Sequence, residues 1–232
     1  MRETGAEIPF TWDLVKDIWR GSSYILLECF RPRQKPLQKI SFAQKPPRAW
    51  YLIWGALRQA GLRSDPKAQI CLHFSDKTYV PGTDLDDRFH INGHCTDISK
   101  SKVAEVFESV FGYGLAIDPA STSGPYLEKG EENGIHDATI ETEQKTPEAG
   151  RVYQKLLDNR TDNGTVLDYR SPTVFGRIPL IFLKERPLDQ RFDNLNTRVR
   201  IAKPEDCFSF EELEKIKQFC DAMHLDLSLI HI

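Results

Sequence analysis

The chain has 232 residues, of which 40% are hydrophobic and 28% are charged. This composition is typical of a soluble globular protein with one large domain or two smaller ones. The 31 Lys and Arg residues against 34 Asp and Glu give a formal net charge of −3, which argues against a general polyanion binder and therefore against nucleic acid as a partner. No apolar run reaches the roughly eighteen residues that a membrane helix needs, so no membrane partner is expected.

The beginning of the chain and its cysteines indicate the compartment. The first residues, MRETGAEIPF, lack the basic and then apolar pattern of a signal peptide. The five cysteines are odd in number, far apart and without a CxxC pair, which argues against a disulfide framework and against a zinc ribbon. We therefore expect a cytoplasmic protein with reduced, mostly buried thiols.

Residues 1–96 have the pattern of an α/β domain. Apolar side chains recur at helical spacing in residues 10–19 and again in residues 50–60. Short apolar runs at 24–30 and 68–74 predict strands. Because a helix followed by a strand is typical of a parallel sheet covered by helices, we predict an α/β layer here.

Residues 103–111 and 209–223 are predicted as amphipathic helices. Asp97 or Ser99 is placed to cap the first helix. The second begins with a capping box, in which Ser209 is followed three residues later by a glutamate. Both helices therefore carry their own start signals.

In residues 97–226 the predicted strands follow one another along the chain, with short polar turns between them. The predicted strands are residues 124–129, 138–141, 151–157, 167–174 and 178–183. Glycine- and asparagine-containing turns between neighbouring strands indicate antiparallel pairing. The predicted fold class is therefore α/β at the start of the chain and α+β with antiparallel sheets after it.

A lysine precedes a glycine-bearing turn at Lys129-Gly130-x-x-x-Gly134. Such a turn can direct backbone N–H groups at anionic oxygens, and a lysine held by a strand adds a point charge beside them. The pattern is neither a Walker A loop nor a GxGxxG fingerprint. It therefore suits phosphate binding, and its alternative is a solvated hairpin tip.

A second set of cations follows at Arg170, Lys184, Arg186 and Arg191. Arg170 and Lys184 alternate with apolar residues on neighbouring predicted strands, so both are expected on one sheet face. Several convergent donors on a rigid sheet suit a triphosphate or an acyl phosphate. The alternative is an outer sheet face whose cations pair with Asp168, Glu185 and Asp189.

Histidine spacing raises the question of a metal site. His90, His94 and Cys95, with His73 upstream, have spacings that metal ligands can have. Residues 76–92 are nevertheless predicted as an irregular loop, and no second pair of ligands is in sight, so no metal ligand is assigned. A hydrolase is disfavoured because the chain has no GxSxG elbow and no cysteine in an activated context.

As an ordered set, the motifs of residues 91–226 resemble a branch of the ATP-grasp superfamily, and more distantly they are similar to ribosomal-protein glutamate ligases and D-alanine–D-alanine ligases. The segments that carry this resemblance are ISKSK (98–102), FESVFGY (107–113), GPYLEK (124–129), NGIHD (133–137), VYQKL (152–156), DYR (168–170), KERP (184–187) and RFDN (191–194). The resemblance implies a Rossmann-like N-terminal domain over 1–96, a small ATP-grasp lobe over 97–150 and an incomplete large lobe over 151–226.

The resemblance also implies a nucleotide site. Lys100 or Lys102 corresponds to the first lysine that reaches the phosphates, and Lys129 to the strand lysine on the α-phosphate side. Residues 130–137 correspond to the loop over the triphosphate. The other implied nucleotide-binding residues are Gly130 and Gly134 in that loop, the adenine hinge Gln154, Lys155, Leu156 and Leu157, and Asp158 or Asn159 near the ribose. The catalytic positions, which bind the γ-phosphate and an acyl phosphate, are Arg170, Lys184, Arg186, Arg191 and Asn194.

The implied activity is an ATP-dependent carboxylate–amine ligase, or a related ligase, that acts through an acyl phosphate with Mg²⁺ as cofactor. Its partner besides ATP would be an unknown carboxylate or amine small molecule or a glycan. One alternative is a non-catalytic nucleotide- or glycan-associated binding module with the same fold. Another is a nucleic-acid binder that uses the basic segment 31–48, which is disfavoured because a solvated loop is the simpler interpretation of that segment.

The match to this branch stops after Asp226, before the hairpin with the Asp-x-Asn motif that supplies the magnesium ligands. The terminal residues 227–232, LSLIHI, look like one reading frame of a transposon-end adapter used in sequencing-library preparation. We therefore expect residues 227–232 to be a non-native tail and the lobe to be truncated. The magnesium ligands would then lie in the missing segment, and the truncated chain would be inactive.

Overall fold

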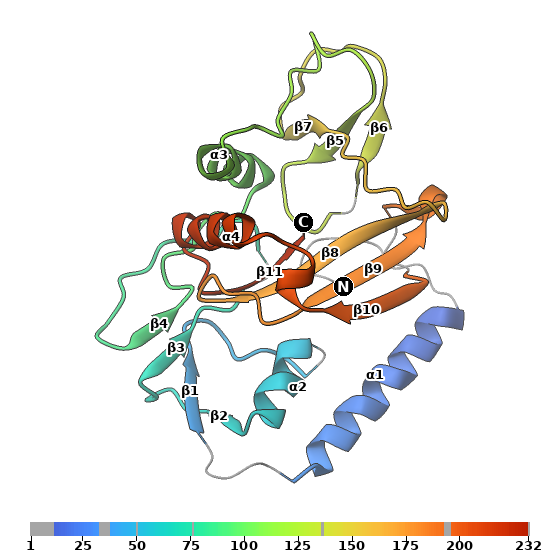
Figure 1. Ribbon diagram of the computed structural model, residues 1–232. Helices are drawn as coiled ribbons and strands as arrows, with labels where there is room; N and C mark the ends of the chain where they lie inside the picture. Colours follow the sequence, from blue (N-terminus) through green and yellow to red (C-terminus); the bar gives the residue numbers. More distant parts are fainter. Residues whose placement is uncertain are drawn as a thin grey trace. The chain divides into compact units, whose positions relative to one another are not determined.

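The structure is a computed structural model that describes residues 12–32, 38–49, 51–75, 77–135, 137–192 and 196–231. The described residues form two compact units, shown in Figure 1. The N-terminal unit holds the described residues up to Lys77 together with Gly82–Gly93. The C-terminal unit holds Thr78–Pro81 and the described residues from His94 onward. The described residues therefore combine helices with one parallel and two antiparallel sheets.

The N-terminal unit contains one four-stranded sheet with the strand order β2-β1-β3-β4. Its elements are α1 (Trp12–Phe30), β1 (Gln38–Phe42), α2 (Leu52–Gln59), β2 (Leu62–Ser64), β3 (Ile70–Leu72) and β4 (Phe89–Ile91). All its strand pairs are parallel, which confirms the predicted parallel sheet. Helix α2 confirms the helix predicted over 50–60, of which Trp50 lies outside the described residues.

Helix α1 continues through residues 24–30, so the strand predicted there is wrong. Tyr24 and Glu28 lie one helical turn apart and both contact α2. Gln59 Nε2 donates to Tyr24 Oη at 3.4 Å and to Glu28 Oε1 at 3.1 Å, and Arg58 Nη2 donates to the Glu28 carbonyl at 2.9 Å. Tyr24 and Glu28 are four residues apart, the spacing at which side chains share one face of a helix. Side chains on one face of a strand would be two residues apart.

Strand β4 lies inside the segment 76–92 that was predicted as an irregular loop. It pairs in parallel with β3, and Phe89 N–H extends the pairing by donating to the Gln69 carbonyl at 2.8 Å. A strand of three residues at a sheet edge is too short to show an alternating hydrophobic pattern. It is recognised as a strand only by its pairing with β3. The prediction of a wholly irregular segment is therefore wrong at these residues.

The C-terminal unit contains the sheets β6-β5-β7 and β10-β9-β8-β11, both antiparallel. Figure 1 shows both sheets together with the helices α3 and α4 of this unit. The elements are α3 (Lys100–Phe111), β5 (Tyr126–Gly130), β6 (Thr139–Glu141), β7 (Arg151–Lys155), β8 (Thr165–Val174), β9 (Ile181–Pro187), η1 (Leu188–Gln190), β10 (Arg198–Ala202), η2 (Pro204–Asp206), α4 (Phe210–Ala222) and β11 (Leu227–His231). Strands β5 to β9 and their antiparallel pairing confirm the hairpin pattern read from residues 124–183.

Both helices of this unit begin at the caps that their local signals predict, and α3 also ends at a glycine. Ser99 Oγ accepts from the Lys102 N–H at 3.3 Å, and α3 ends at Gly112, which has a left-handed φ of 82°. At the start of α4, Ser209 N–H donates to Glu212 Oε2 at 2.7 Å and Glu212 N–H donates to Ser209 Oγ at 3.2 Å, which completes the capping box. No helix within the described ranges has the length and apolar character needed to cross a lipid bilayer.

Helices α3 and α4 share the main apolar cluster of the C-terminal unit. Val106 of α3 packs with Phe219 of α4 and Met223 at its end, all less than a tenth exposed. Partly buried apolar residues that surround them are Ile98, Val103, Phe107, Val110, Phe111, Leu225 and Ile230. This cluster joins the segment that precedes the small sheet to the helix that follows the large one.

Residues 227–231, which fall in the expected tail, form strand β11 against β8. The pairing runs from Leu227 opposite Val174 to His231 opposite Arg170. The hydroxyl groups of Thr173 and Ser228 lie 2.6 Å apart. The described part of this segment is thus an edge strand of the large sheet.

Candidate functional site

Lys129 projects from β5 onto the same sheet face as Gln154 of β7. The antiparallel register of the two strands places them there, because alternate residues of a strand share a face. Lys129 Nζ donates to Gln154 Oε1 at 3.0 Å. Burial, followed by the neighbouring charges of Lys100 and Arg191, lowers the pKa of Lys129. A partly buried ammonium with no carboxylate beside it among the described residues is suited to an anionic ligand.

Of the two lysines predicted at the start of α3, the structure brings only Lys100 to the β5 turn. Lys100 Nζ donates to the Gly130 carbonyl at 2.5 Å and to the Glu132 carbonyl, and burial lowers its pKa. Lys102 Nζ instead pairs with Glu105 of its own helix at 3.1 Å, near the solvent. Lys100 and Lys129 therefore form the lysine pair of the site.

The turn predicted to lie over a triphosphate is closed by an acid from the chain itself. Gly130 N–H donates to both carboxylate oxygens of Asp137 at 3.0 Å. A Cβ at position 130 would lie 2.9 Å from Asp137 Oδ2, so any larger residue would force this carboxylate to shift. Gly134 has a φ of 81°, in the left-handed region that glycine favours. The Gly130 amide thus already holds an anionic group.

Arg151 of β7 organises the opposite face of the small sheet and was missed by sequence reasoning. Its Nε donates to Glu128 Oε1 at 2.7 Å, and its Nη1 donates to Asp137. Lys145 forms an ion pair with the other oxygen of Glu128, and its hydrogen bond, more than that from Arg151, lowers the pKa of this buried carboxyl. Arg151 lies opposite Gly130 because of the β5–β7 register, and no local sequence pattern predicts that register.

The predicted adenine hinge, residues 154–157, spans the end of β7. Gln154 and Lys155 belong to the strand, whereas Leu156 and Leu157 lie beyond its end. Lys155 N–H donates to the Leu115 carbonyl at 2.8 Å, so this amide is already engaged. Any reading of an adenine edge would therefore fall to the Leu156–Leu157 part of the hinge.

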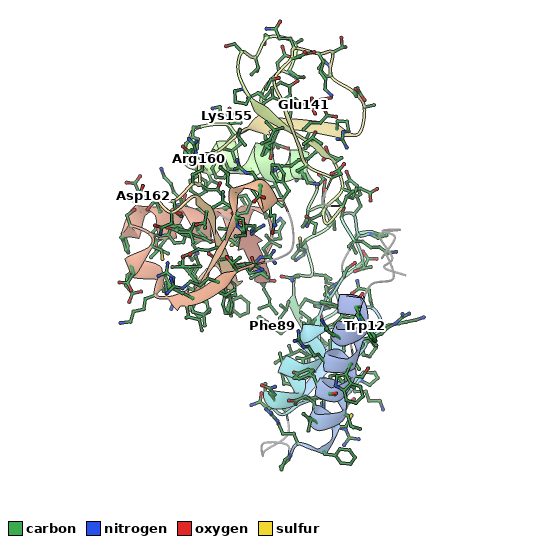
Figure 2. All side chains as sticks on the ribbon, turned by 90° about the vertical axis from the view of Figure 1, so that its right-hand side faces the viewer. Trp12, Phe89, Glu141, Lys155, Arg160 and Asp162 are labelled. Carbon is green, nitrogen blue, oxygen red and sulfur yellow. The ribbon has the colours of Figure 1, made fainter. Side chains whose placement is uncertain are left out.

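The predicted ribose position lies on the connection between β7 and β8, which Figure 2 marks with Lys155 and Arg160. Asp158 forms an ion pair with Arg160 at 2.7 Å, which lowers the pKa of Asp158 to about 2. Asn159 instead faces inward: its Nδ2 donates to Asp168 Oδ1 at 2.9 Å. Of the two alternatives for this position, Asn159 is the one in contact with the other site residues.

Strands β8 and β9 bring three of the predicted cations to one sheet face. Asp168 lies opposite Lys184, and alternation along the strands puts Arg170 and Arg186 on that face as well. Arg186 Nη2 forms an ion pair with Asp168. Burial and then the charge of Arg186 lower the pKa of Arg170, while burial, Arg170 and Arg186 lower that of Lys184. The expected shared face of Arg170 and Lys184 is present.

The alternative was an outer sheet face whose cations pair with neighbouring acids, and such pairing accounts for only some of these cations. Glu185 pairs with Arg200 of β10 at 3.0 Å, on the opposite side of the sheet from Lys184. Arg170 Nε is buried without a hydrogen-bond partner among the described residues. Within those residues neither Arg170 nor Lys184 has a salt-bridge partner, so this face carries excess positive charge.

Arg191 connects the two groups of cations. Its Nη2 donates to the Leu157 carbonyl at 3.2 Å and to Asn159 Oδ1 at 2.9 Å. Its own carbonyl accepts from Arg186 Nη1 at 3.0 Å, and its charge acts on Lys129. We call Lys100, Lys129, Arg170, Lys184, Arg186 and Arg191 the cation site. Asn194, the remaining predicted catalytic residue, lies outside the described residues.

The acids beside the cation site do not form a magnesium centre. Glu128 is engaged by Lys145 and Arg151, Asp137 by Gly130 and Arg151, and Asp168 by Arg186 and Asn159. Mg²⁺ needs carboxylates that are available to it in near-octahedral geometry. Among the described residues these acids serve the protein's own cations and do not fit that role.

No model of a known protein family matches the chain, and a search of curated proteins finds no match either. The relation to ATP-grasp enzymes therefore stays a prediction from the motifs of residues 98–194. The geometry adds that most of these motifs contribute cations to one site.

Proposed function

We propose that the C-terminal unit binds ATP and serves a ligase reaction in which a carboxylate is activated as an acyl phosphate. The observation that carries this proposal is the excess of cations in the cation site, where Asp168 is the one acid of the described residues whose charge acts on both Arg170 and Lys184. A triphosphate carries several negative charges, and convergent Arg and Lys donors on a rigid sheet offset them.

The arrangement of the cation site suggests which residues would bind each part of the nucleotide. Lys100 and Lys129 would bind the α- and β-phosphates, next to the end of β7. Leu156 and Leu157 would read the adenine edge with backbone groups, and Asn159 would lie near the ribose. Arg170 and Lys184, neither of which has a salt-bridge partner among the described residues, would bind the γ-phosphate.

The reaction then follows from charge neutralisation and positioning. A substrate carboxylate oxygen attacks the γ-phosphorus, the bond to the bridging oxygen breaks, and ADP leaves. An amine next attacks the acyl carbon, and inorganic phosphate departs as the amide forms. Arg170, Lys184 and Arg186 would hold the transferred phosphoryl group through both steps. The carboxylate and the amine acceptor, a small molecule or a glycan, are not specified by these residues.

Nucleotide affinity of the Lys129→Met variant tests the binding step. Loss of a buried ammonium–phosphate contact is expected to weaken ATP binding by about 10- to 100-fold. Lys102→Met is the matched control, because Lys102 pairs with Glu105 and should leave the affinity unchanged. Equal ATP affinity of the Lys129→Met variant and the wild type in titration calorimetry would refute the assignment.

A non-catalytic nucleotide-binding module is the second candidate function. It is favoured by the engagement of Glu128, Asp137 and Asp168 with the protein's own cations. Such a module would bind ATP with the same dependence on Lys129 but form no ADP when carboxylates and amines are supplied together. ADP production that requires both substrates would favour the ligase.

A further inference from the structure

Three metal-ligating side chains meet on one face of the parallel sheet in the N-terminal unit. Cys71 lies in β3, and His73 follows two residues later, so both side chains fall on the same side of the strand. The β3–β4 register places His90 opposite Cys71. The Cys71 thiol and one ring nitrogen of each histidine all lie within 4.8 Å of one another.

The two imidazoles are oriented by a carboxylate. His73 Nε2 and His90 Nδ1 are 2.8 Å apart, and His90 Nε2 lies 3.1 Å from Asp86 Oδ1. Arg88 Nε donates to both oxygens of Asp86 at 2.8 Å, which holds that group as a carboxylate, an acceptor only. A neutral His90 therefore donates from Nε2 and presents the lone pair of Nδ1 to the cluster.

We propose that Cys71, His73 and His90 form a zinc-binding site, with Asp86 as the carboxylate that orients His90. A thiolate and two imidazoles are a ligand set that Zn²⁺ takes, and three protein ligands leave the fourth position to water or a substrate atom. A carboxylate on the distal nitrogen of a ligating histidine is the usual outer support of such a metal. This site does not depend on nucleotide binding by the C-terminal unit.

Zinc binding requires the ligand atoms to shift from their present positions. Tetrahedral zinc with bonds of about 2.0–2.1 Å to nitrogen places two ring nitrogens about 3.3 Å apart, against 2.8 Å here, so the two imidazoles have to separate. The Cys71 sulfur, now within 4.8 Å of both nitrogens, has to come to bonding distance of the same ion. On binding, the Cys71 thiol releases its proton to solvent and the sulfur bonds the ion. The proton that His73 carries on Nε2 is exchanged for one on Nδ1, so the ring stays neutral.

A nucleophilic role for the same cysteine is disfavoured by burial. Cys71 has no exposed surface, so a substrate carbon has no direct approach to its sulfur. The His90 side chain is 9% exposed and His73 is partly buried, so an ion can enter from the histidine side. Figure 2 labels Phe89, the residue that precedes His90 at the start of β4.

Cobalt substitution tests the site in the full chain. Protein treated with a chelator is titrated with Co²⁺ alone, and thiolate-to-cobalt charge-transfer absorption reports a Co–S bond. We expect one Co²⁺ per chain, displaced by Zn²⁺, with the charge-transfer band lost in Cys71→Ser. Cys29→Ser, which changes an exposed cysteine, is the matched control and should keep the band.

A second variant keeps the test informative if Cys71→Ser fails to fold. Asp86→Asn changes a side chain that is 54% exposed and should lower the metal affinity by about 10- to 100-fold, with the fold retained by circular dichroism. Asp84→Asn, at another exposed acid of the same loop, should have no effect. The proposal is overturned by the absence of saturable one-to-one binding, by a charge-transfer band that survives Cys71→Ser, or by equal affinities of Asp86→Asn and the wild type.

Discussion

Lys129 Nζ donates a hydrogen bond to Gln154 Oε1 at 3.0 Å across the β5–β7 pair. The amide oxygen neutralises no charge, so the ammonium keeps its full capacity to attract an anion. Burial, Lys100 and Arg191 all act to lower the pKa of Lys129, which means that its charged form is held at a cost. A bound phosphate would relieve that cost.

The Gln154→Glu variant is expected to weaken ATP binding by roughly tenfold or more, because its carboxylate would pair with Lys129 and repel the phosphates. Gln144→Glu is the control, since Gln144 is exposed and donates to the Thr122 carbonyl. Titration calorimetry with ATP measures both variants. Tighter ATP binding by Gln154→Glu would contradict the proposed place of the phosphates.

Glu128→Gln is expected to lower the free energy of unfolding at neutral pH by about 1–3 kcal/mol, because the buried carboxylate accepts from Lys145 and Arg151. The pKa of Glu128 is lowered in the folded state, so its stabilisation is present above the unfolded-state pKa of about 4.3. It is lost as the pH falls through the lower folded-state pKa.

Urea denaturation at several pH values checks this dependence. The difference between wild type and Glu128→Gln should shrink as the solution is acidified below the ordinary glutamate range. Glu105→Gln, which changes an exposed acid of α3, should leave the stability essentially unchanged at every pH. A difference for Glu128→Gln that grows toward low pH would show that the ion pairs with Lys145 and Arg151 are not its cause.

Lys184→Met should stabilise the nucleotide-free protein by roughly 0.5–1 kcal/mol and weaken ATP binding at the same time. The pKa of Lys184 is lowered, first by burial and then by Arg170 and Arg186, so the charged ammonium destabilises the folded state. This destabilisation is complete below the folded-state pKa. It disappears as the pH rises to the unfolded-state value of about 10.4.

Thermal unfolding with and without tripolyphosphate separates the two effects of Lys184→Met. The variant should have the higher Tm without the anion and the smaller rise in Tm with it. Lys217→Met removes a lysine that pairs with Asp221 on α4 and should not raise the Tm. A lower Tm for Lys184→Met without the anion would contradict the picture of mutually repelling cations.

Gly130→Ala is expected to destabilise the protein by about 1–3 kcal/mol, because the new methyl group would displace Asp137 from two hydrogen bonds. Gly21→Ala is the opposite control. A Cβ at position 21 meets nothing within 4 Å, and alanine favours a helix such as α1, so stability should rise by up to about 1 kcal/mol. Differential scanning calorimetry measures both. A Gly130→Ala protein as stable as the wild type would mean that Asp137 contributes nothing there.

Local sequence patterns were sufficient to predict those features of the fold that depend on residues close together in the sequence. The capping box of Ser209 and Glu212 and the left-handed end of α3 at Gly112 depend on hydrogen bonds within one turn. The shared face of Arg170 and Lys184 depends only on alternation along paired strands. The same rules misjudged residues 24–30, where a short apolar run fits either period until contact with α2 selects the helix.

The amino-acid sequence by itself determined the helices predicted over 50–60, 103–111 and 209–223, the succession of antiparallel strands between residues 124 and 183, and the set of cations that the C-terminal unit brings together. Only the tertiary structure decided that Lys100 rather than Lys102 joins Lys129, and that Arg151 holds Asp137 in the turn. It also grouped His90 with Cys71 in the N-terminal unit and placed the ring of His94 5.8 Å from that of His224 in the C-terminal unit. The physical reason is strand register: which residues face each other across two strands depends on pairing between distant segments, and no local periodicity records it.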